Sequence, residues 1–487
     1  MNIKNISILG LILAIFFGLG LSFKPEKKDS QQPELESKQL AQSPPMGWNS
    51  FDSYGVYLHE EAALANLEVF AKKLKPHGYK YFVIDAGWFG EFKLKDGTMY
   101  PAEKHATEVN INEYGLLQPS KTYFPNGLQP IIDRCHELGL KFGIHLMRGI
   151  PRAAYKKNTP IKGTDYHARD IADTTSICEW NHQNYGVDMS KPGAQEFYNS
   201  LINQMADWGV DFLKYDDLVP FPKEVEGVAN AIEQCGRPMV YSLSPGNKVD
   251  VSAINSFKRA HMLRVTPDIW DDQVGLDQCF DAWRKWQGEE EPGFWIDLDM
   301  IPFGKLQLMS PKPEGVNGHE SKKDIAKKIE SGELSNVELL AGKGWTRQSA
   351  FTKDQMYTFI TLRALSASPL MMGGDLPTLD DFSLELITHE DVLDCNQNGI
   401  MGSLIYDEDN VEIWKTPKKD RKDGWIGIFN RSKSLKSLSF SKSDFNFVDD
   451  EEYIIHDIWA NKEVDNFYFT INPNGVVFLK YASPIKM

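Results

Sequence analysis

The stretch DFLKYDDLVP, residues 211–220, joins an apolar run to a lysine and two consecutive carboxylates. Successive side chains of a β-strand point to opposite faces, so Phe212, Lys214 and Asp216 would share one face. A lysine inside a strand is costly to bury unless it is paired, and Asp216 stands two residues on, where it can pair with Lys214. The earlier stretch YFVIDAGWFG, residues 81–90, likewise ends an apolar run with a carboxylate, Asp85. A single strand that simply ends in a polar loop would also show this pattern, but such an ending would not be expected to repeat. The repetition therefore indicates that the charged residues at the strand ends have a shared purpose.

An apolar strand with a charged residue near its C-terminal end recurs along the chain from Pro44 onward. Strands are expected at 46–49, 79–87, 141–149, 210–217, 237–244, 261–266, 293–300 and 369–374, with helices between them, among them one at 249–258. Eight strand–helix units predict a closed (β/α)8 TIM barrel, an α/β fold, rather than an open sheet. Three connections, 92–124, 150–192 and 301–349, are too long for plain linkers and would lie on the C-terminal face of the barrel.

After about Asn398 the sequence pattern changes to short runs of alternating apolar and polar residues, separated by Gly, Asp, Asn and Ser. This pattern predicts an antiparallel β-sandwich. We therefore expect a catalytic barrel at residues 44–397 and a C-terminal β-sandwich domain at 398–487. The sandwich would be either a carbohydrate-binding module or, as we favour, a packing domain without catalysis.

The N-terminus carries Lys4 and then an apolar run over residues 6–21 that ends in small residues. This pattern is typical of a secretory signal peptide, which we place at residues 1–22. An uncleaved anchor is the alternative, because the run is close to the lower length limit of a membrane span. Residues 23–43 are polar and lack periodicity, which predicts a disordered tether. We expect an exported protein, periplasmic or secreted, without a stable membrane span.

The composition narrows the choice of partner. The formal charge of −15 argues against nucleic acid, because a polyanion requires a basic surface. The aromatic content of 12% is somewhat high, which weakly favours a carbohydrate ligand, although a large core would also account for it. The five cysteines are scattered and lack metal-binding spacing, so we expect no metal and no cofactor. The oligomeric state stays open.

Strand parity gathers charged side chains at the expected mouth of the barrel. In the 261–268 segment Arg264 and Asp268 share a parity, and in the 293–300 segment Asp297 and Asp299 do. The other charged residues expected at the strand ends are Asp85, His145, Arg148, Lys214 and Asp216. Such a mouth suits cleavage of a glycosidic bond, in which one carboxylate attacks and another delivers a proton. A neighbouring lysine would keep the attacking carboxylate ionised.

Several ordered motifs resemble the α-galactosidase (melibiase) family of retaining glycoside hydrolases, and the resemblance runs from about Pro44 to the end of the sandwich. The matching segments are PMGWNS at 45–50, Ile84-Asp85 with Trp88, Phe142-Gly143-Ile144, LKYD at 213–216, PGFW at 292–295 with Asp297 and Asp299-Met300, and SASPL at 366–370.

The resemblance implies roles for individual residues. Asp216 matches the family nucleophile and Asp268 the general acid/base. Residues matching the sugar-binding positions are Asp85, Lys214 and Arg264, with Trp48 in the pocket wall, Asp299 closing the opposite side, and His145 at the place of the family's usual tyrosine.

The departures from the family pattern bear on the sugar. Asp85 is followed by Ala86 where the family has a second aspartate that grips the outer hydroxyls of the sugar, and Ser244-Pro245-Gly246-Asn247 replaces the usual specificity loop. The leading expectation is an oligo- or polysaccharide substrate with a terminal α-galactosyl unit. One alternative is β-L-arabinopyranose, which is galactose without its hydroxymethyl arm. Another is a non-catalytic sugar-binding protein, but such a protein would need neither Asp216 nor Asp268.

Overall fold

The computed structural model describes residues 40–101, 106–310, 327, 331, 344–419, 422–448 and 452–483. The predicted signal peptide at 1–22 and most of the predicted tether at 23–43 lie outside these residues. Among the described helices, none combines the length and apolar character needed to cross a membrane.

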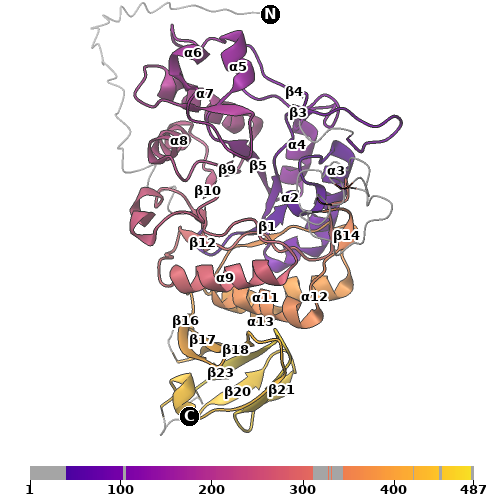
Figure 1. The fold of residues 1–487 in the computed structure, drawn as a ribbon, viewed down its shortest axis with the longest axis vertical. Helices are drawn as coiled ribbons and strands as arrows, with labels where there is room; N and C mark the ends of the chain where they lie inside the picture. Colours follow the sequence, from indigo (N-terminus) through magenta and orange to yellow (C-terminus); the bar gives the residue numbers. More distant parts are fainter. Residues whose placement is uncertain are drawn as a thin grey trace, which may run out of the picture.

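Eight parallel strands form the core of the larger part of the molecule (Figure 1). They are β1 (Met46–Asn49), β2 (Tyr81–Ile84), β5 (Lys141–Met147), β9 (Phe212–Asp216), β10 (Val240–Leu243), β11 (Met262–Arg264), β12 (Trp295–Asp297) and β15 (Leu370–Met372). Their order is β12-β11-β10-β9-β5-β2-β1-β15. Just beyond β12, the Ile301 amide donates to the Met371 carbonyl and the Gly373 amide donates to the Ile301 carbonyl, which joins the two ends of the sheet. The predicted TIM barrel is confirmed.

Helices cover the outside of the strands, as the apolar periodicity predicts. They are α3 (Glu60–Lys73), α4 (Gln129–Glu137), α7 (Ala194–Trp208), α8 (Pro222–Gln234), α9 (Gln273–Lys285), α11 (Lys353–Leu365), α12 (Asp381–Thr388) and α13 (Glu390–Gln397). At 249–258, where a helix is expected, the chain forms only the short 3-10 helix η2 (Val251–Ser256). This segment is rich in Ser, Asn and Val, which favour helices weakly, and of η2 only Ile254 is buried.

Apart from β1, the barrel strands are shorter than the sequence pattern indicates, and the residues beyond their C-terminal ends form one face of the barrel. The first long connection pairs β3 (Gly90–Glu91) with β4 (Glu108–Val109). The second contains β6 (Ile150–Pro151), α5 (Arg152–Lys157), α6 (Ala168–Ile171), β7 (Ala172–Asp173) and β8 (Asn184–Val187). The third pairs β13 (Lys305–Leu306) with β14 (Arg347–Gln348), and most of the residues between these two strands lie outside the described part of the chain.

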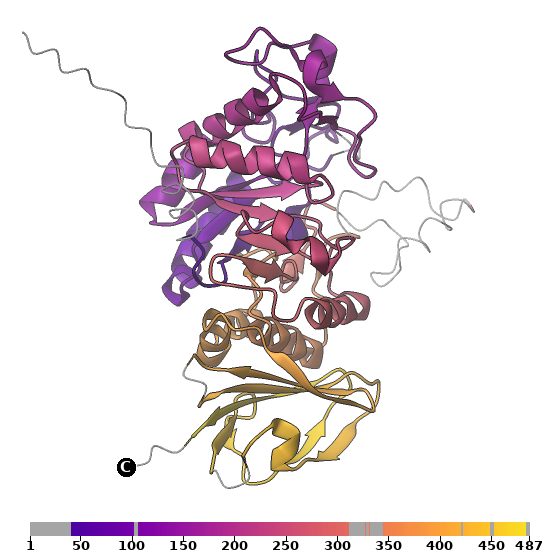
Figure 2. The same cartoon turned by 90° about the vertical axis from the view of Figure 1, so that its left-hand side faces the viewer.

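The C-terminal part is an antiparallel β structure below the barrel (Figure 2). One sheet contains β16 (Ser403–Glu408), β17 (Val411–Pro417), β18 (Gly424–Asn430), β23 (Val476–Ala482), β20 (Ile454–Asp457) and β21 (Lys462–Glu463), and a second pairs β19 (Lys436–Ser439) with β22 (Tyr468–Ile471). A separate apolar core, which includes Ile413, Ile428 and Phe469, fills the space between the sheets. The predicted sandwich is therefore confirmed.

A pair of stacked tryptophans joins the barrel to the sandwich. The ring of Trp283 on α9 lies 3.7 Å from that of Trp414 on β17, centroid to centroid, with 19° between the planes. Both side chains are fully buried, and the Trp283 indole donates a hydrogen bond to the Gly402 carbonyl. The contact buries two large aromatic surfaces and leaves no unpaired indole N–H on Trp283.

We expect Trp283→Ala to lower the free energy of unfolding by about 3–5 kcal/mol, the usual cost of replacing a buried tryptophan by alanine. Urea unfolding followed by circular dichroism measures the loss. Tyr468→Ala is the control, because Tyr468 is 60% exposed on β22 and its replacement should change stability little. Equal midpoints for both variants would contradict a stabilising role for the stacked pair.

Candidate active site

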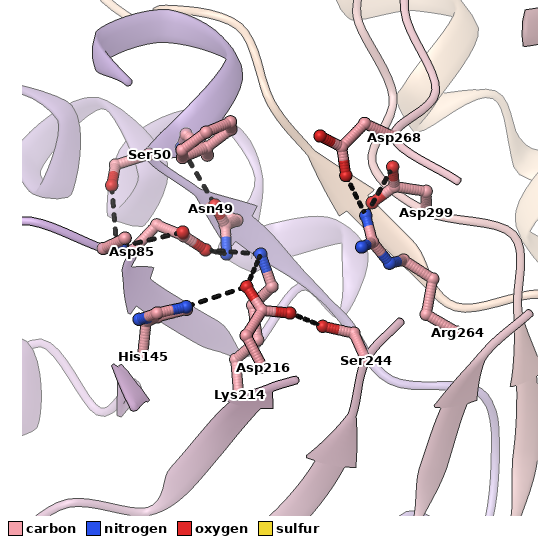
Figure 3. Close-up of polar contacts among 12 residues, drawn as sticks. Asn49, Ser50, Asp85, His145, Lys214, Asp216, Ser244, Arg264, Asp268 and Asp299 are labelled. Carbon is pink, nitrogen blue, oxygen red and sulfur yellow. Dashed lines mark hydrogen bonds and ion pairs between the residues drawn. The ribbon is translucent and has the colours of Figure 1, made fainter. Parts of the chain in front are cut away.

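Lys214 is largely buried, with 12% of its side chain exposed, among carboxylates at the C-terminal ends of β2, β5 and β9 (Figure 3). Its Nζ lies 2.7 Å from Asp85 Oδ2 and 4.0 Å from Asp216 Oδ2. The parity argument predicts Asp216, on the same strand, as the partner of Lys214. The closest partner is instead Asp85, which follows β2. Asn49 Nδ2 also donates to Asp85 Oδ2, at 2.7 Å. Burial lowers the pKa of Lys214, but Asp85 and Asp216 raise it more, so the ammonium stays charged.

Asp216 is held as a carboxylate by its surroundings. His145 Nε2 lies 2.8 Å from Asp216 Oδ2, and the Ser244 hydroxyl donates to Asp216 Oδ1. Burial alone would raise the pKa of Asp216, but Lys214, the hydrogen bond from His145 and the Arg264 charge together hold it well below its usual range. The expected sugar-binding role of His145 would require the side chain to face a ligand. His145 has no exposed surface, and its ring instead supports Asp216.

Arg264 forms a second cluster on the other side of the site (Figure 3). Its Nη1 lies 2.8 Å from Asp268 Oδ1 and 3.1 Å from Asp299 Oδ2. Asp299 also accepts a hydrogen bond from the Ile269 amide at 2.8 Å. The Asp268 side chain is 60% exposed, whereas that of Asp299 is 3% exposed. Asp268 is thus the accessible carboxylate of this cluster and Asp299 the buried one.

Trp48 does not form the wall of the site. It is fully buried, stacks on Phe82 with 4.7 Å between ring centroids, and donates a hydrogen bond to the Gly374 carbonyl. We correct its expected role to core packing, because a side chain without exposed surface cannot contact a sugar. Phe51, three residues later in α2 (Phe51–Tyr54), is partly exposed, and its ring centroid lies 5.8 Å from Lys214 Nζ.

Asp52 is a further carboxyl at the site that the sequence analysis missed. It follows β1 in α2, and only 1% of its surface is exposed. Burial raises its pKa well above the usual range, the Asp299 and Asp268 carboxylates add to the rise, and Lys214 opposes it. Its Oδ2 has no hydrogen-bond partner in the described part of the chain. Asp52 is a charged residue shortly after the first strand, as in the pattern at the other strands. That pattern could have identified Asp52 from the sequence.

Asp217, next to Asp216 in sequence, belongs to a different cluster. Arg148 places its Nε 3.0 Å from Asp217 Oδ2 and its Nη1 2.9 Å from Glu224 Oε1 and 3.1 Å from Ser176 Oγ. Burial raises the pKa of both carboxyls, and Arg148 opposes the rise. The cluster ties the end of β9 to α8 and to the β7–β8 loop, residues 174–183.

Comparisons with known proteins bear on the family and the fold. The protein-family model described as the alpha galactosidase C-terminal beta sandwich domain matches residues 408–481 of the sequence. A β-L-arabinopyranosidase from Geobacillus stearothermophilus is 36% identical, with a TM-score of 0.80 over 93% of this chain and 99% of that one. The chain belongs to the GH27 family of glycosidases, the family of the α-galactosidases. It is a glycoside hydrolase, and its substrates are sugars.

Two other relatives show the spread within the GH27 family. A putative α-N-acetylgalactosaminidase from Bacillus halodurans is 33% identical, with a TM-score of 0.73 over 90% of this chain and 97% of that one. The α-galactosidase A of Cellvibrio japonicus is 26% identical over 88% of this chain and 86% of its own length. These relatives differ in the sugar that their names give.

We expect Arg148→Met to destabilise the protein by about 3–5 kcal/mol near neutral pH, because two buried carboxylates lose their counter-charge. Carboxyls whose folded pKa lies above the unfolded value stabilise the fold at low pH and lose that contribution as pH rises. The variant raises both pKa values further, so its deficit relative to wild type should shrink between about pH 7 and about pH 5.

Urea unfolding at both pH values measures the effect of Arg148→Met. Arg134→Met is the matched control, because Arg134 pairs with Glu68 on the surface, where ion pairs contribute little. A deficit that is the same at both pH values would contradict this assignment.

Proposed function

We propose that the protein is an exo-acting, retaining glycosidase that works by double displacement. Asp216 is the nucleophile in this proposal and Asp268 the general acid/base. The observation that supports it best is the environment of Asp216, which combines burial with Lys214, His145 and Ser244 around one carboxylate. A carboxylate that stays ionised and lies at a strand end of a TIM barrel is suited to attack an anomeric carbon.

In the first step an Asp216 oxygen attacks the anomeric carbon while Asp268 gives its proton to the leaving oxygen. A covalent glycosyl–enzyme ester forms and the leaving group departs as an alcohol. In the second step Asp268 takes a proton from water, which attacks the same carbon and releases Asp216. The 60% exposure of Asp268 supports its role, because this residue must meet both the leaving group and water.

The neighbouring side chains supply sugar recognition in this proposal. Lys214 and Asp85 offer a charged donor and an acceptor to ring hydroxyls, and Arg264 offers donors from the opposite side. Phe51 gives an apolar surface beside Lys214. Charged hydrogen-bonding groups in a buried setting discriminate strongly against a sugar that lacks the matching hydroxyl.

We propose β-L-arabinopyranosides as the preferred substrates and α-galactosides as secondary ones. Ala86 cannot accept the hydrogen bonds that the family's second aspartate takes from the O4 and O6 side of galactose. The arabinose ring lacks the hydroxymethyl arm, so it does not need an acceptor for O6. The 36% identity to a β-L-arabinopyranosidase, a variant of which was crystallised with arabinose, supports this order over our expectation from sequence.

We also propose that the protein is exported, on the strength of the apolar run at residues 6–21 alone. Mass spectrometry of the N-terminus of the native protein tests this. A chain that begins near residue 23 supports cleavage, and an intact N-terminus in a membrane fraction supports the anchor.

Asp268→Ala should slow glycosides with poor leaving groups by orders of magnitude and an aryl glycoside with a good leaving group much less, because only the former need a proton. Added azide should restore turnover of the aryl glycoside and give a glycosyl azide of retained configuration. Proton NMR of the products checks the stereochemistry. Asp216→Ala is the control, since it should inactivate the enzyme on both substrates. An inverted product from the wild type would refute the mechanism.

Ala86→Asp should shift the ratio of kcat/KM values toward aryl α-galactoside, and away from aryl β-L-arabinopyranoside, by roughly one to two decades. This is the size of a recovered hydrogen bond to a buried hydroxyl, about 1–3 kcal/mol. Steady-state kinetics of both substrates on both proteins gives the ratio, and Ala86→Leu controls for side-chain size. A wild type that ignores the arabinoside, with no gain from Ala86→Asp, would contradict the preference.

A further inference from the structure

The β7–β8 loop carries large apolar side chains on its surface. Trp180 is 56% exposed and Ile177 is 46% exposed, although both belong to residue types that are usually buried. Between them, Cys178 is buried and turns inward. The loop therefore presents an indole and an aliphatic side chain outward from a base that is anchored inside.

Hydrogen bonds attach the base of this loop to the end of β5, the neighbour of the strand that carries Asp216. Asn184 Nδ2 donates to the Met147 carbonyl at 3.3 Å and to the Arg148 carbonyl at 2.9 Å. The Arg148 amide donates in turn to the Asp216 carbonyl at 2.9 Å. Met147 and Asp216 are register partners in the β5–β9 ladder. The loop thus starts at the same level of the barrel as Asp216.

The tip of the loop is attached to the same place through Cys178. The Cys178 thiol interacts with the Asp217 carboxylate and with the backbone amides of Trp180 and Asn181. Ser176 Oγ accepts a hydrogen bond from Arg148 Nη1, which also binds Glu224. Cys178, two residues before Trp180, is therefore anchored next to Asp217, the residue that directly follows Asp216, while the Trp180 side chain is exposed to solvent.

We propose that Trp180 forms the binding platform for the sugar unit on the leaving-group side of the scissile bond, and that Ile177 extends this surface. The flat face of an indole packs against the apolar C–H face of a pyranose ring, and a backbone anchored in advance keeps the entropic cost of binding low. In the proposed mechanism the leaving group meets Asp268, the exposed carboxylate, so it lies on the solvent side of the site, and this loop is anchored next to Asp217, the residue after Asp216. The inference rests on the proposed function and adds that the substrate is a glycoside whose leaving group is itself a sugar.

Trp180→Ala should lower kcat/KM roughly tenfold on a disaccharide, the size of a lost aromatic stacking contact, and change it less than about twofold on the matching glycosyl fluoride, whose leaving group has no ring. Melibiose and α-galactosyl fluoride are the probes. If the Ala86 experiment selects the pentose, a β-L-arabinopyranosyl-glucose and β-L-arabinopyranosyl fluoride replace them. Trp180→Phe should keep most of the wild-type rate on the disaccharide, because phenylalanine also offers a ring face.

Tyr468→Ala is the matched control, since it removes an equally exposed aromatic ring from the sandwich and should alter neither rate. Equal losses by Trp180→Ala on the disaccharide and on the fluoride would overturn the proposal and assign Trp180 to the support of Asp217. An unchanged kcat/KM of Trp180→Ala on the disaccharide would also overturn the proposal. If the variant also changed its oligomeric state in sedimentation, Trp180 would be a contact between copies of the chain. A wild type that turns over neither α-galactosyl fluoride nor β-L-arabinopyranosyl fluoride would refute the proposed function, and the platform with it.

Discussion

The site depends on one lysine buried between two carboxylates. An unpaired ammonium at the end of a barrel strand would be far too costly to bury, so Lys214 requires both Asp85 and Asp216 close by. This requirement constrains three strands at once, because β5 pairs with β2 on one side and with β9 on the other. His145 and Lys214 are register partners, and a slip of one residue would turn every one of these side chains to the opposite face.

The carboxyls around Lys214 and Arg264 differ in their exposure to solvent, and this difference suits them to different proposed roles. Asp216 is buried, hydrogen-bonded and held in its ionised form, as an attacking group must be. Asp268 pairs with Arg264 but keeps most of its side chain in solvent. Asp52 adds a buried carboxyl whose pKa is raised, so the site combines carboxyls that favour opposite protonation states. Such a separation of pKa values is common where one group must stay ionised and others must carry protons.

The sequence predicts those parts of the site that lie within regular strands. Alternation along residues 212–216 places Lys214 and Asp216 on one face, and the structure agrees. The method fails where the strand ends. Trp48 still belongs to β1, where it is buried, and the partly exposed ring is Phe51, whose direction depends on the turn into α2. Asp268 lies four residues beyond Arg264, the last residue of β11, so its position follows from the loop and not from parity.

Pairing across strands escapes the sequence for a different reason. The closest partner of Lys214 is separated from it by 129 positions in the chain, and only the register of the assembled barrel brings the two together. The cluster of Arg148, Asp217 and Glu224 likewise joins three separate elements. Local patterns contain no information about such contacts, whereas the apolar periodicity that builds the barrel is local and is predicted well.

The residues that we propose to distinguish one sugar from another lie outside the strands that hold the charges. Ala86 is in the turn after β2, Ser244 begins the segment after β10, and the β7–β8 loop follows β5. Changes at Ala86 or in the β7–β8 loop leave Lys214 and its carboxylates in place, because the strand register holds them, whereas Ser244 also donates a hydrogen bond to Asp216. We infer that this separation allows the relatives of this chain to share one catalytic arrangement while their names divide between α-galactosidases and a β-L-arabinopyranosidase. The choice of sugar can then change by substitution at a turn, without a change in the charged residues that we propose as the catalytic groups.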